Sequence, residues 1–254
     1  MELFDSLFDD EILVCQPQTP LASVLADHLM LREGYRSMLA TLVVPDRMLA
    51  EVARQLTAGA SIPVSVITSG GAGGLMGLAR RNLPGLDIVS AEPALRDLDN
   101  LAGSAARVVS AAAEFGSEIA IFVELPNRPG WQAAVELVEA AGLYGKLAAE
   151  KVEPRRTAEQ LSILIEADLP FKVTTEGGGG LAVLTATEAL IDGANLDDAA
   201  QFIQSADNDQ IQPLVSTWGQ ATQSRIRRRI RRLGSDRLVN LINDYAAARQ
   251  QTDS

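Results

Sequence analysis

Residues 118–142 read EIAIFVELPNRPGWQAAVELVEAAG, and this stretch contains one complete unit of the fold. It begins with a short apolar run, EIAIFVEL, which has the length and composition of a buried β-strand. A turn rich in proline follows, and from Trp131 onward apolar residues recur at helical spacing. Gly142 comes just after the helical part of the stretch, where a residue in the left-handed conformation commonly ends a helix. The stretch therefore predicts a strand followed by a helix.

Five other stretches repeat this order of strand, turn and helix. Repeated strand–helix units build parallel sheets whose faces are covered by helices. We therefore predict a single α/β domain with a TIM-barrel-like fold, and the alternative is an open doubly wound sheet. The predicted strands span residues 39–44, 62–68, 86–92, 118–125, 143–150 and 169–176.

The two ends of the chain depart from the repeat. Six units occupy residues 37–193, whereas a complete barrel of this type has eight. Residues 1–36 predict a helical or irregular N-terminal segment, in which EILVC at 11–15 could form an extra strand. Residues 194–254 predict helices. We therefore expect an incomplete or irregular barrel with a helical C-terminal segment.

Composition narrows the class of partner. The formal net charge is −11, and an acidic surface repels phosphate, so we expect neither nucleic acid nor an anionic membrane as a partner. The single cysteine cannot form an internal disulfide, and no signal peptide or membrane-spanning run is recognisable. These features favour the cytoplasm, with a small-molecule ligand as the expected partner. A homo-oligomer stays open.

Polar residues at the ends of the predicted strands are the candidates for catalysis, because barrel active sites gather there. Lys146 and Lys172 each interrupt an apolar run, and Glu92 and Glu124 end their own strands. A buried lysine either pairs with carboxylates or loses its proton, and a lysine with a lowered pKa is a nucleophile for Schiff-base formation. The glutamates could transfer protons. The alternative is a structural network of ion pairs that closes the barrel.

Two glycine-rich loops are candidates for binding an anion through backbone N–H groups. One follows the sixth predicted strand, and the other follows the second and precedes a helical stretch. Neither loop contains the lysine and hydroxyl residue of a P-loop, and flexible turns have the same composition. The candidate ligand-binding residues are Thr174, Gly177, Gly178, Gly179, Ser69 and Gly70.

Metal and cofactor sites are not indicated. His28 is the single histidine and lies in a helical stretch beside Asp27 and Arg32, which favours a surface or capping role. Without a cluster of histidine and cysteine, we expect no zinc site. A magnesium site built from Glu92, Glu124 and Glu150 is disfavoured by the two nearby lysines. We therefore predict neither a metal nor a cofactor.

The sequence RIRRRIRRL at 225–233 contains six arginines, and we call it the arginine-rich segment. Ile226, Ile230 and Leu233 fall on one face of a helix. We expect that face to pack on the body of the protein while the arginines pair with the protein's own carboxylates. An oligomer contact or a site for an acidic ligand is the alternative.

Two resemblances bear on function. FKVTTEG at 171–177 is similar to the sixth-strand motif of class I aldolases of the deoxyribose-phosphate aldolase type. In that family a strand lysine forms the Schiff base and a second lysine lies on a neighbouring strand. The resemblance implies that Lys172 forms the Schiff base and that Lys146 is the second lysine. It covers only this short motif.

The second resemblance is broader. The run from GLYGKL at 142 through LPFKVTTEG to LGSDRLVNLI, which ends at 242, resembles an uncharacterised bacterial family of barrel proteins. Typical members read GKLRTGG at the fifth unit and PFKATAGLHH at the sixth. This chain keeps Lys146 and Lys172 but departs at residues 148–154 and 175–180. The family carries no activity that could be transferred.

Two functions follow as hypotheses. In the first, the chain is a lyase- or aldolase-like enzyme that acts on a small carbonyl or phosphorylated metabolite. Lys172 is then its nucleophile or electrostatic stabiliser, Lys146 lowers the pKa of Lys172, and Glu124 or Glu92 moves protons. In the second, the barrel has no catalytic activity and serves ligand binding or assembly. Its reason is the loss of polar residues from the fifth and sixth loops.

Overall fold

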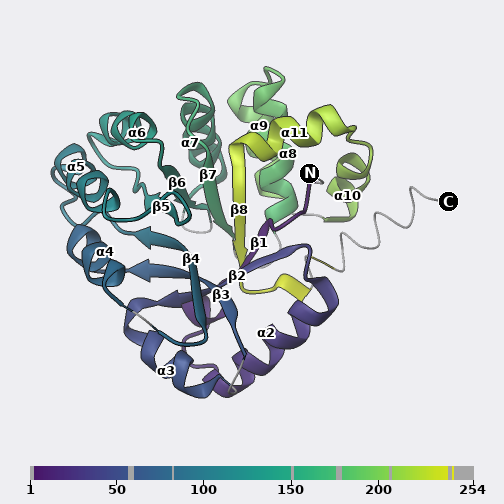
Figure 1. The fold of residues 1–254 in the computed structure, drawn as a ribbon. Helices are drawn as coiled ribbons and strands as arrows, with labels where there is room; N and C mark the ends of the chain where they lie inside the picture. Colours follow the sequence, from purple (N-terminus) through teal and green to yellow (C-terminus); the bar gives the residue numbers. More distant parts are fainter. Residues whose placement is uncertain are drawn as a thin grey trace.

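A computed structural model describes residues 3–56, 60–81, 83–149, 152–175, 179–205, 208–239 and 242. Its described strands form a closed parallel barrel in sequence order (Figure 1). The barrel closes because β1 pairs with both β2 and β8, as in the register of Phe8 with Leu233. The strands are β1 Phe8–Asp10, β2 Leu39–Pro45, β3 Ile62–Thr68, β4 Leu86–Pro93, β5 Ala120–Glu124, β6 Tyr144–Ala148, β7 Phe171–Thr175 and β8 Ile230–Ser235.

Closure confirms the barrel, shows that it is complete, and rules out the open doubly wound sheet. The helices form an outer ring around the strands (Figure 1). None of the described helices combines the length and the hydrophobicity that a bilayer span requires. The helical elements are α1 Ile12–Cys15, α2 Leu21–Tyr35, η1 Asp46–Met48, α3 Leu49–Gln55, α4 Gly71–Ala79, α5 Leu101–Ala112, α6 Trp131–Ala140, α7 Pro154–Glu166, α8 Gly180–Ile191, α9 Leu196–Ser205, α10 Asn208–Ser216 and α11 Gln220–Arg229.

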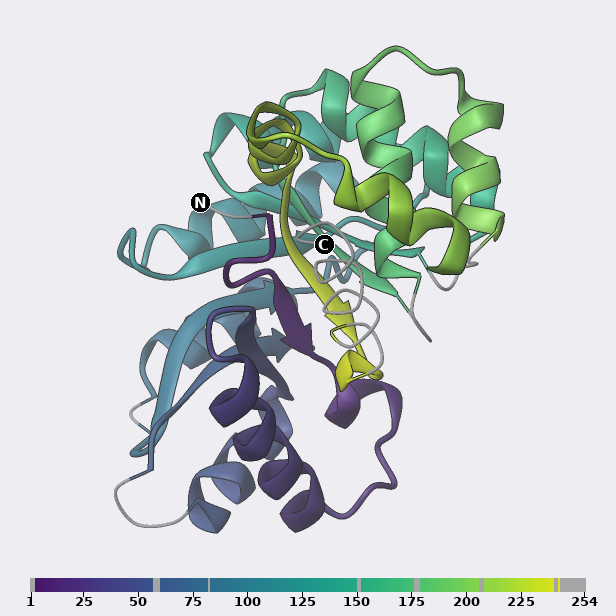
Figure 2. The ribbon, with the colours of Figure 1, turned by 90° about the vertical axis from the view of Figure 1, so that its right-hand side faces the viewer.

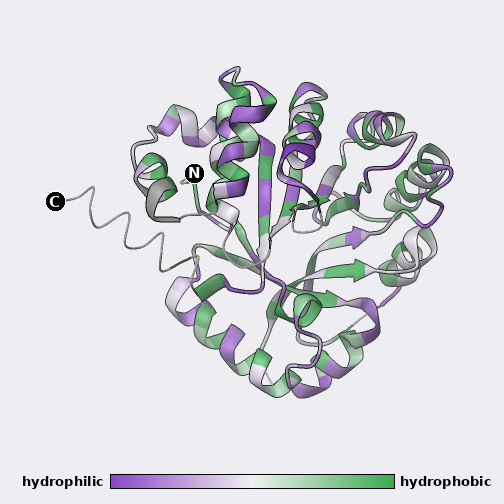
Figure 3. Ribbon diagram, turned by 180° about the vertical axis from the view of Figure 1, so that it is seen from behind, coloured by the Kyte–Doolittle hydropathy of each residue, from purple (hydrophilic) through white to green (hydrophobic). Residues whose placement is uncertain are grey.

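The unit that opens at residue 118 folds as its sequence indicates. Strand β5 leads through the proline-rich turn into α6, and Gly142, just past that helix, has a φ of 66°. A positive φ is accessible to glycine without steric cost, which is why the helix ends there. Figure 3 shows hydrophobic and hydrophilic residues alternating around the outer helices, as expected for helices that cover a sheet with one face.

The two missing strands lie in the terminal segments that were predicted to be helical or irregular. Strand β1 is FDD at Phe8–Asp10, and EILVC, the expected extra strand, instead contributes Ile12–Cys15 to helix α1. Strand β8 begins at Ile230, after the four helices α8 to α11, which gather on one side of the barrel (Figure 2). Both strands escaped the sequence pattern because neither is a continuous apolar run.

The two faces of the barrel wall differ in character. Side chains of alternate strand residues point to opposite faces. One face is apolar and packs between the strands and the helices. Its fully buried residues include Leu42, Val44, Val64 and Val66. The opposite parity carries polar residues that meet inside the barrel, beginning with Thr41, whose hydroxyl donates to Asp9 across 2.6 Å. The conventional apolar core therefore lies outside the barrel wall, and a polar network lies inside it.

Candidate functional site

Lys172 lies at the centre of the polar network. Its side chain is fully buried, and its Nζ lies 2.9 Å from Asp9 Oδ2, 2.8 Å from Glu11 Oε1 and 2.8 Å from Glu92 Oε1. An ammonium group has three N–H donors and no acceptor, so three carboxylates match its three protons. The neutral amine would have one donor too few for this arrangement.

Lys146 is the second lysine of the network and pairs with Lys172 in the register of β6 and β7. Its Nζ lies 2.6 Å from Glu92 Oε2, while the other oxygen of Glu92 contacts Lys172. Glu92 therefore bridges the two lysines, and the Ser65 hydroxyl, which donates to Glu92 Oε1 across 2.6 Å, holds the bridging carboxylate in place.

The network continues around the barrel toward β8. The Thr174 hydroxyl donates to Glu11 Oε1 across 3.2 Å, and Arg232 Nε lies 3.7 Å from Asp9 Oδ1. Glu11 presses against the backbone of Gly234, where a Cβ atom would overlap its carboxylate. Glycine at this position of β8 is therefore required by close approach and not by backbone conformation.

The charges inside the barrel reinforce one another. Burial disfavours the charge of Lys172, but Asp9, Glu11 and Glu92 outweigh burial and raise its pKa well above the ordinary value of 10.5. Burial likewise opposes the charge of Lys146, yet attraction to Glu92 raises the pKa of this lysine too. Burial would raise the pKa of Glu92, but the two ammonium groups hold it well below its usual value.

These directions correct one prediction. The sequence suggested that Lys146 would lower the pKa of Lys172 and make it a neutral nucleophile, whereas the pKa of Lys172 is raised. The repulsion between the lysines is present, but it is outweighed by three carboxylates, those of Asp9, Glu11 and Glu92. Lys172 is therefore a protonated lysine at neutral pH.

A pocket of about 730 Å³ opens at the carboxyl ends of β5 and β6. Lys146 lies at its base with 5% of its surface exposed, and Glu124, its neighbour in the β5–β6 register, lines the same pocket. Arg128 from the loop before α6 and Arg156 from α7 also line it. The pocket thus combines an ammonium group, a carboxylate and two guanidinium groups.

Trp131 fixes the loop on one side of this pocket. Its indole N–H donates to the carbonyl of Leu125 across 3.1 Å, and its ring is buried at the start of α6. A buried indole N–H commonly finds such a partner. The loop that carries Arg128 is therefore attached to the barrel at both of its ends.

Comparison with known proteins supports the fold at the level of architecture. No protein-family model and no curated protein matches the sequence. Among solved structures, the 7,8-dihydropteroate synthase from Vibrio fischeri ES114 superposes with a TM-score of 0.52 at 7% identity, over 100% of this chain and 96% of that one. The chain has a TIM-barrel fold. At this identity the similarity extends to the fold alone.

Two further solved structures superpose on this TIM barrel less closely. The dihydropteroate synthase of Yersinia pestis gives a TM-score of 0.49 at 9% identity, over 99% of this chain and 95% of that one. The UMP synthase of Leishmania donovani gives 0.49 at 16% identity, over 85% of this chain and 55% of that one.

The TIM barrel brings some predicted site residues together and separates others. Glu92, Lys146 and Lys172 converge, and Glu124 joins Lys146 at the pocket. The Thr174 hydroxyl donates to Glu11 and so belongs to the network. Gly179 precedes the first residue of α8, whereas Gly177, Gly178 and Glu150 lie outside the described residues.

Ser69 and Gly70 occupy a different part of the barrel mouth, at the start of α4. The Ser69 hydroxyl faces the carboxylate of Asp46 at 3.4 and 3.5 Å, and Arg96 donates to the Ser69 carbonyl across 3.0 Å. A Cβ atom at Gly70 would lie 2.9 Å from the backbone nitrogen of Gly74. Glycine at position 70 is thus explained by the packing of the loop against its own helix.

His28 is not a surface residue. It is fully buried in α2, and its Nδ1 lies 2.9 Å from Asp10 Oδ2 on β1. The acidic run Asp9, Asp10 and Glu11 escaped sequence analysis, although its alternation places Asp9 and Glu11 inside the barrel and Asp10 toward α2. Three acidic residues beside an expected strand were the available signal.

Within the part of the chain that the structure describes, no group of three or more histidine, cysteine, aspartate or glutamate side chains is arranged to hold a metal ion. Asp9, Glu11 and Glu92 do lie close together, but the ammonium group of Lys172 occupies the position between them.

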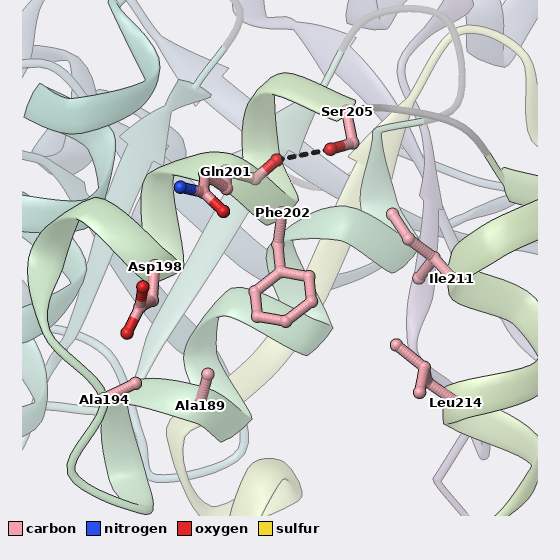
Figure 4. A pocket seen from close by; sticks show the side chains of 8 residues that line it. All are labelled: Ala189, Ala194, Asp198, Gln201, Phe202, Ser205, Ile211 and Leu214. Atoms are coloured by element: carbon pink, nitrogen blue, oxygen red, sulfur yellow. Dashed lines mark hydrogen bonds between the residues drawn. The ribbon is translucent and has the colours of Figure 1, made fainter.

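A second hollow of about 560 Å³ lies among α8, α9 and α10, outside the barrel (Figure 4). Phe202, Ile211 and Leu214 form its apolar part, and Asp198, Gln201 and Ser205 its polar part. The Ser205 hydroxyl donates to the backbone carbonyl of Gln201 across 2.6 Å. None of the described residues that line this hollow belongs to a strand of the barrel.

The arginine-rich segment is only partly helical. Helix α11 ends at Arg229, and residues from Ile230 onward form β8, which corrects the prediction of one continuous helix. Ile226, Ile230 and Leu233 are nevertheless fully buried, as expected. The segment changes from helix to strand because Ile230 and Leu233 complete the barrel wall.

Three arginines of α11 make polar contacts within the molecule. Arg225 contacts Asp192 across 2.6 Å, and Arg229 pairs with Asp168. Arg227 is buried and donates to the carbonyls of Asp5, Ile230 and Arg231, each across 3.1 Å. Arg225 and Arg229 therefore pair with carboxylates as expected, whereas Arg227 binds backbone carbonyls instead.

Proposed function

We propose that this barrel is an enzyme that uses acid–base chemistry on a small anionic carbonyl compound, in the manner of a lyase. The observation that carries the proposal is the pocket at β5 and β6, where Glu124, the last residue of β5, pairs in register with Lys146 of β6. A carboxylate beside a protonated amine is the pair of groups that proton transfer next to a carbonyl requires.

Each group has a distinct role in this proposal. Glu124 removes a proton from the carbon adjacent to the substrate carbonyl. The ammonium group of Lys146 donates a hydrogen bond to the carbonyl oxygen and stabilises the negative charge that develops there as the enolate forms. Arg128 and Arg156 hold a carboxylate or phosphate of the substrate, since guanidinium groups bind such anions through paired hydrogen bonds.

The proposed reaction shares the carbonyl chemistry of the aldolases that FKVTTEG resembles, but it does not use their Schiff base. Formation or cleavage of a carbon–carbon bond next to a carbonyl can proceed through an enolate, without a Schiff base. The raised pKa values of Lys146 and Lys172 support this route, because a protonated lysine stabilises negative charge but does not attack a carbonyl. Lys172 then holds Glu92, and Glu92 holds Lys146 at the base of the pocket.

Proton exchange tests the proposal. The protein is incubated in deuterium oxide with pyruvate or with dihydroxyacetone phosphate, and loss of the proton signals next to the carbonyl is followed by NMR. We expect exchange with at least one probe, reduced about 100-fold or more in Glu124→Gln and in Lys146→Met. Asp46→Asn removes a carboxylate elsewhere at the barrel mouth and serves as the control.

Two results would overturn it. Absence of exchange with both probes removes the enolate reaction for carboxylated and phosphorylated ketones. Trapping of a covalent adduct on Lys172 by borohydride restores the Schiff-base hypothesis.

A barrel without catalytic activity is the second candidate. The complete pairing of Lys172 with three carboxylates favours it, because a network of this kind also holds strands together. In that case the pocket binds an anionic ligand without converting it. Pyruvate or dihydroxyacetone phosphate would then raise the melting temperature, while the exchange rates stay at those of the probe alone.

A further inference from the structure

Lysine is scarce in this chain and is placed selectively. The chain has 22 basic residues, of which only Lys146, Lys151 and Lys172 are lysines, so that the other positive side chains are arginines. Two of these three lysines lie inside the barrel and share one carboxylate. Lysine is the basic residue whose protonation state depends most strongly on its surroundings when buried.

We propose that Glu92 determines the chemistry of Lys146, so that loss of its carboxylate converts Lys146 from a cation into an amine that forms Schiff bases in the pocket. This inference rests on the proposed role of Lys146 as a protonated group at the base of the pocket. It assigns to Glu92 a positioning role, since Glu92 acts through Lys146 and does not line the pocket.

The geometry of Lys146 makes Glu92 its decisive partner. Glu92 Oε2 lies 2.6 Å from its Nζ, and it is the one carboxylate with a direct ion pair to Lys146 among the described residues. The other charged groups that act on Lys146 are Glu11 and Glu124, which favour its protonation, and Lys172, which opposes it. Burial also opposes it.

Removal of Glu92 affects the two lysines unequally. Lys172 keeps Asp9 at 2.9 Å and Glu11 at 2.8 Å, so it stays protonated. Lys146 loses its direct partner and remains buried beside the ammonium group of Lys172. Both burial and the like charge then favour its neutral form. The lysine that loses its proton is therefore the one that reaches the pocket.

Access reinforces the selectivity. Lys146 lines the pocket, whereas Lys172 is fully buried and does not line it. The neutral nitrogen of Lys146 attacks the carbonyl carbon of an aldehyde, and a carbon–nitrogen bond forms. The carbonyl oxygen leaves as water after taking up two protons, and the product is an iminium ion. A hydride donor reduces the iminium to a stable secondary amine.

Reductive labelling measures this reactivity. In a Lys151→Arg background the lysines that remain are the two of the barrel interior. The protein is treated with acetaldehyde and cyanoborohydride over a series of pH values, and mass spectrometry of peptides gives the labelling rate of each lysine. Acetaldehyde carries no anionic group, so labelling does not depend on the proposed arginine contacts.

With Glu92 present, we expect slow labelling of Lys146 below the ordinary lysine pKa of 10.5, because its raised pKa keeps the ammonium form predominant there. In Glu92→Gln we expect the profile to move at least one pH unit lower, so that labelling near neutral pH increases about tenfold or more. The control is Asp46→Asn, which removes a carboxylate that contacts Ser69 and neither lysine. This variant should leave the pH profile of Lys146 labelling unchanged.

Several outcomes would overturn the inference. One is an unchanged labelling profile in folded Glu92→Gln, and another is faster labelling of Lys172 than of Lys146. If Glu92→Gln does not fold, as judged by circular dichroism, the parent protein still decides: labelling of Lys146 at neutral pH as fast as that of the N-terminal amine contradicts the role of Glu92. Failure of the exchange experiment alone leaves this labelling prediction intact, so the two proposals fail separately.

Discussion

The barrel interior and the arginine-rich segment both concentrate positive charge, but they satisfy it differently. Inside the barrel, compact ammonium groups point at carboxylates, and Lys172 contacts three of them. Along α11, guanidinium groups spread over backbone carbonyls and surface carboxylates, as with Arg227 and Arg225. The comparison indicates that lysine serves where one point charge must be shared among strands, and arginine serves where several acceptors are dispersed.

The largest expected effect comes from Lys172→Met. The substitution preserves an unbranched side chain but leaves Asp9, Glu11 and Glu92 with one cation fewer in a buried site. Breaking a buried charged network by removing one partner costs about 3–5 kcal/mol. We expect a loss of this size in the free energy of unfolding, measured by denaturant titration. A loss below about 1 kcal/mol would show that the network does not stabilise the barrel.

An intermediate effect is expected for Arg227→Ala. This change removes the Arg227 donor from the backbone carbonyls of Asp5 and Ile230 at the junction of α11 and β8, whereas the carbonyl of Arg231 keeps a hydrogen bond from Arg232. An unsatisfied buried acceptor costs about 1–3 kcal/mol, although water entering the site offsets part of this when one side becomes open. Denaturant titration measures the change. Arg227→Lys keeps the charge without the planar fork and should restore only part of the stability.

The smallest effect is expected for Arg229→Ala. Arg229 pairs with Asp168 on the surface, where solvent screens the attraction. Exposed pairs contribute about 0.2–1 kcal/mol. Asp168→Asn should change stability by a similarly small amount, and the double variant should lose no more than the larger single change. An effect of Arg229→Ala as large as that of Lys172→Met would remove the distinction between the two regions.

The barrel was predictable from sequence because most of its units carry the same signal. Six strands appear as apolar runs followed by helical periodicity, and the unit at 118–142 folds as its residues indicate. The first and last strands carry no such signal. Strand β1 is FDD, and β8 follows a helix within one run of arginines, so charge masked the strand in both places.

The candidate site was predictable in part. Lys146, Lys172 and Glu92 were found because a charged residue in an apolar strand is conspicuous, and the structure brings them together. The direction of the lysine pKa shifts was not predictable, because it depends on Asp9 and Glu11, whose strand was not recognised. Distances between the strands of a barrel follow from its closure, which the local sequence pattern does not contain.

Closure by the first and last strands has a consequence for the order in which the chain folds. Asp9 is synthesised 163 residues before Lys172, its buried partner, and β8, which completes the pairing of β1, comes later still. During synthesis Asp9 therefore remains hydrated until the strand that carries Lys172 has emerged. Contacts this distant in sequence form slowly. We expect the barrel to assemble around β2 to β7 first, and the charged interior to dehydrate last.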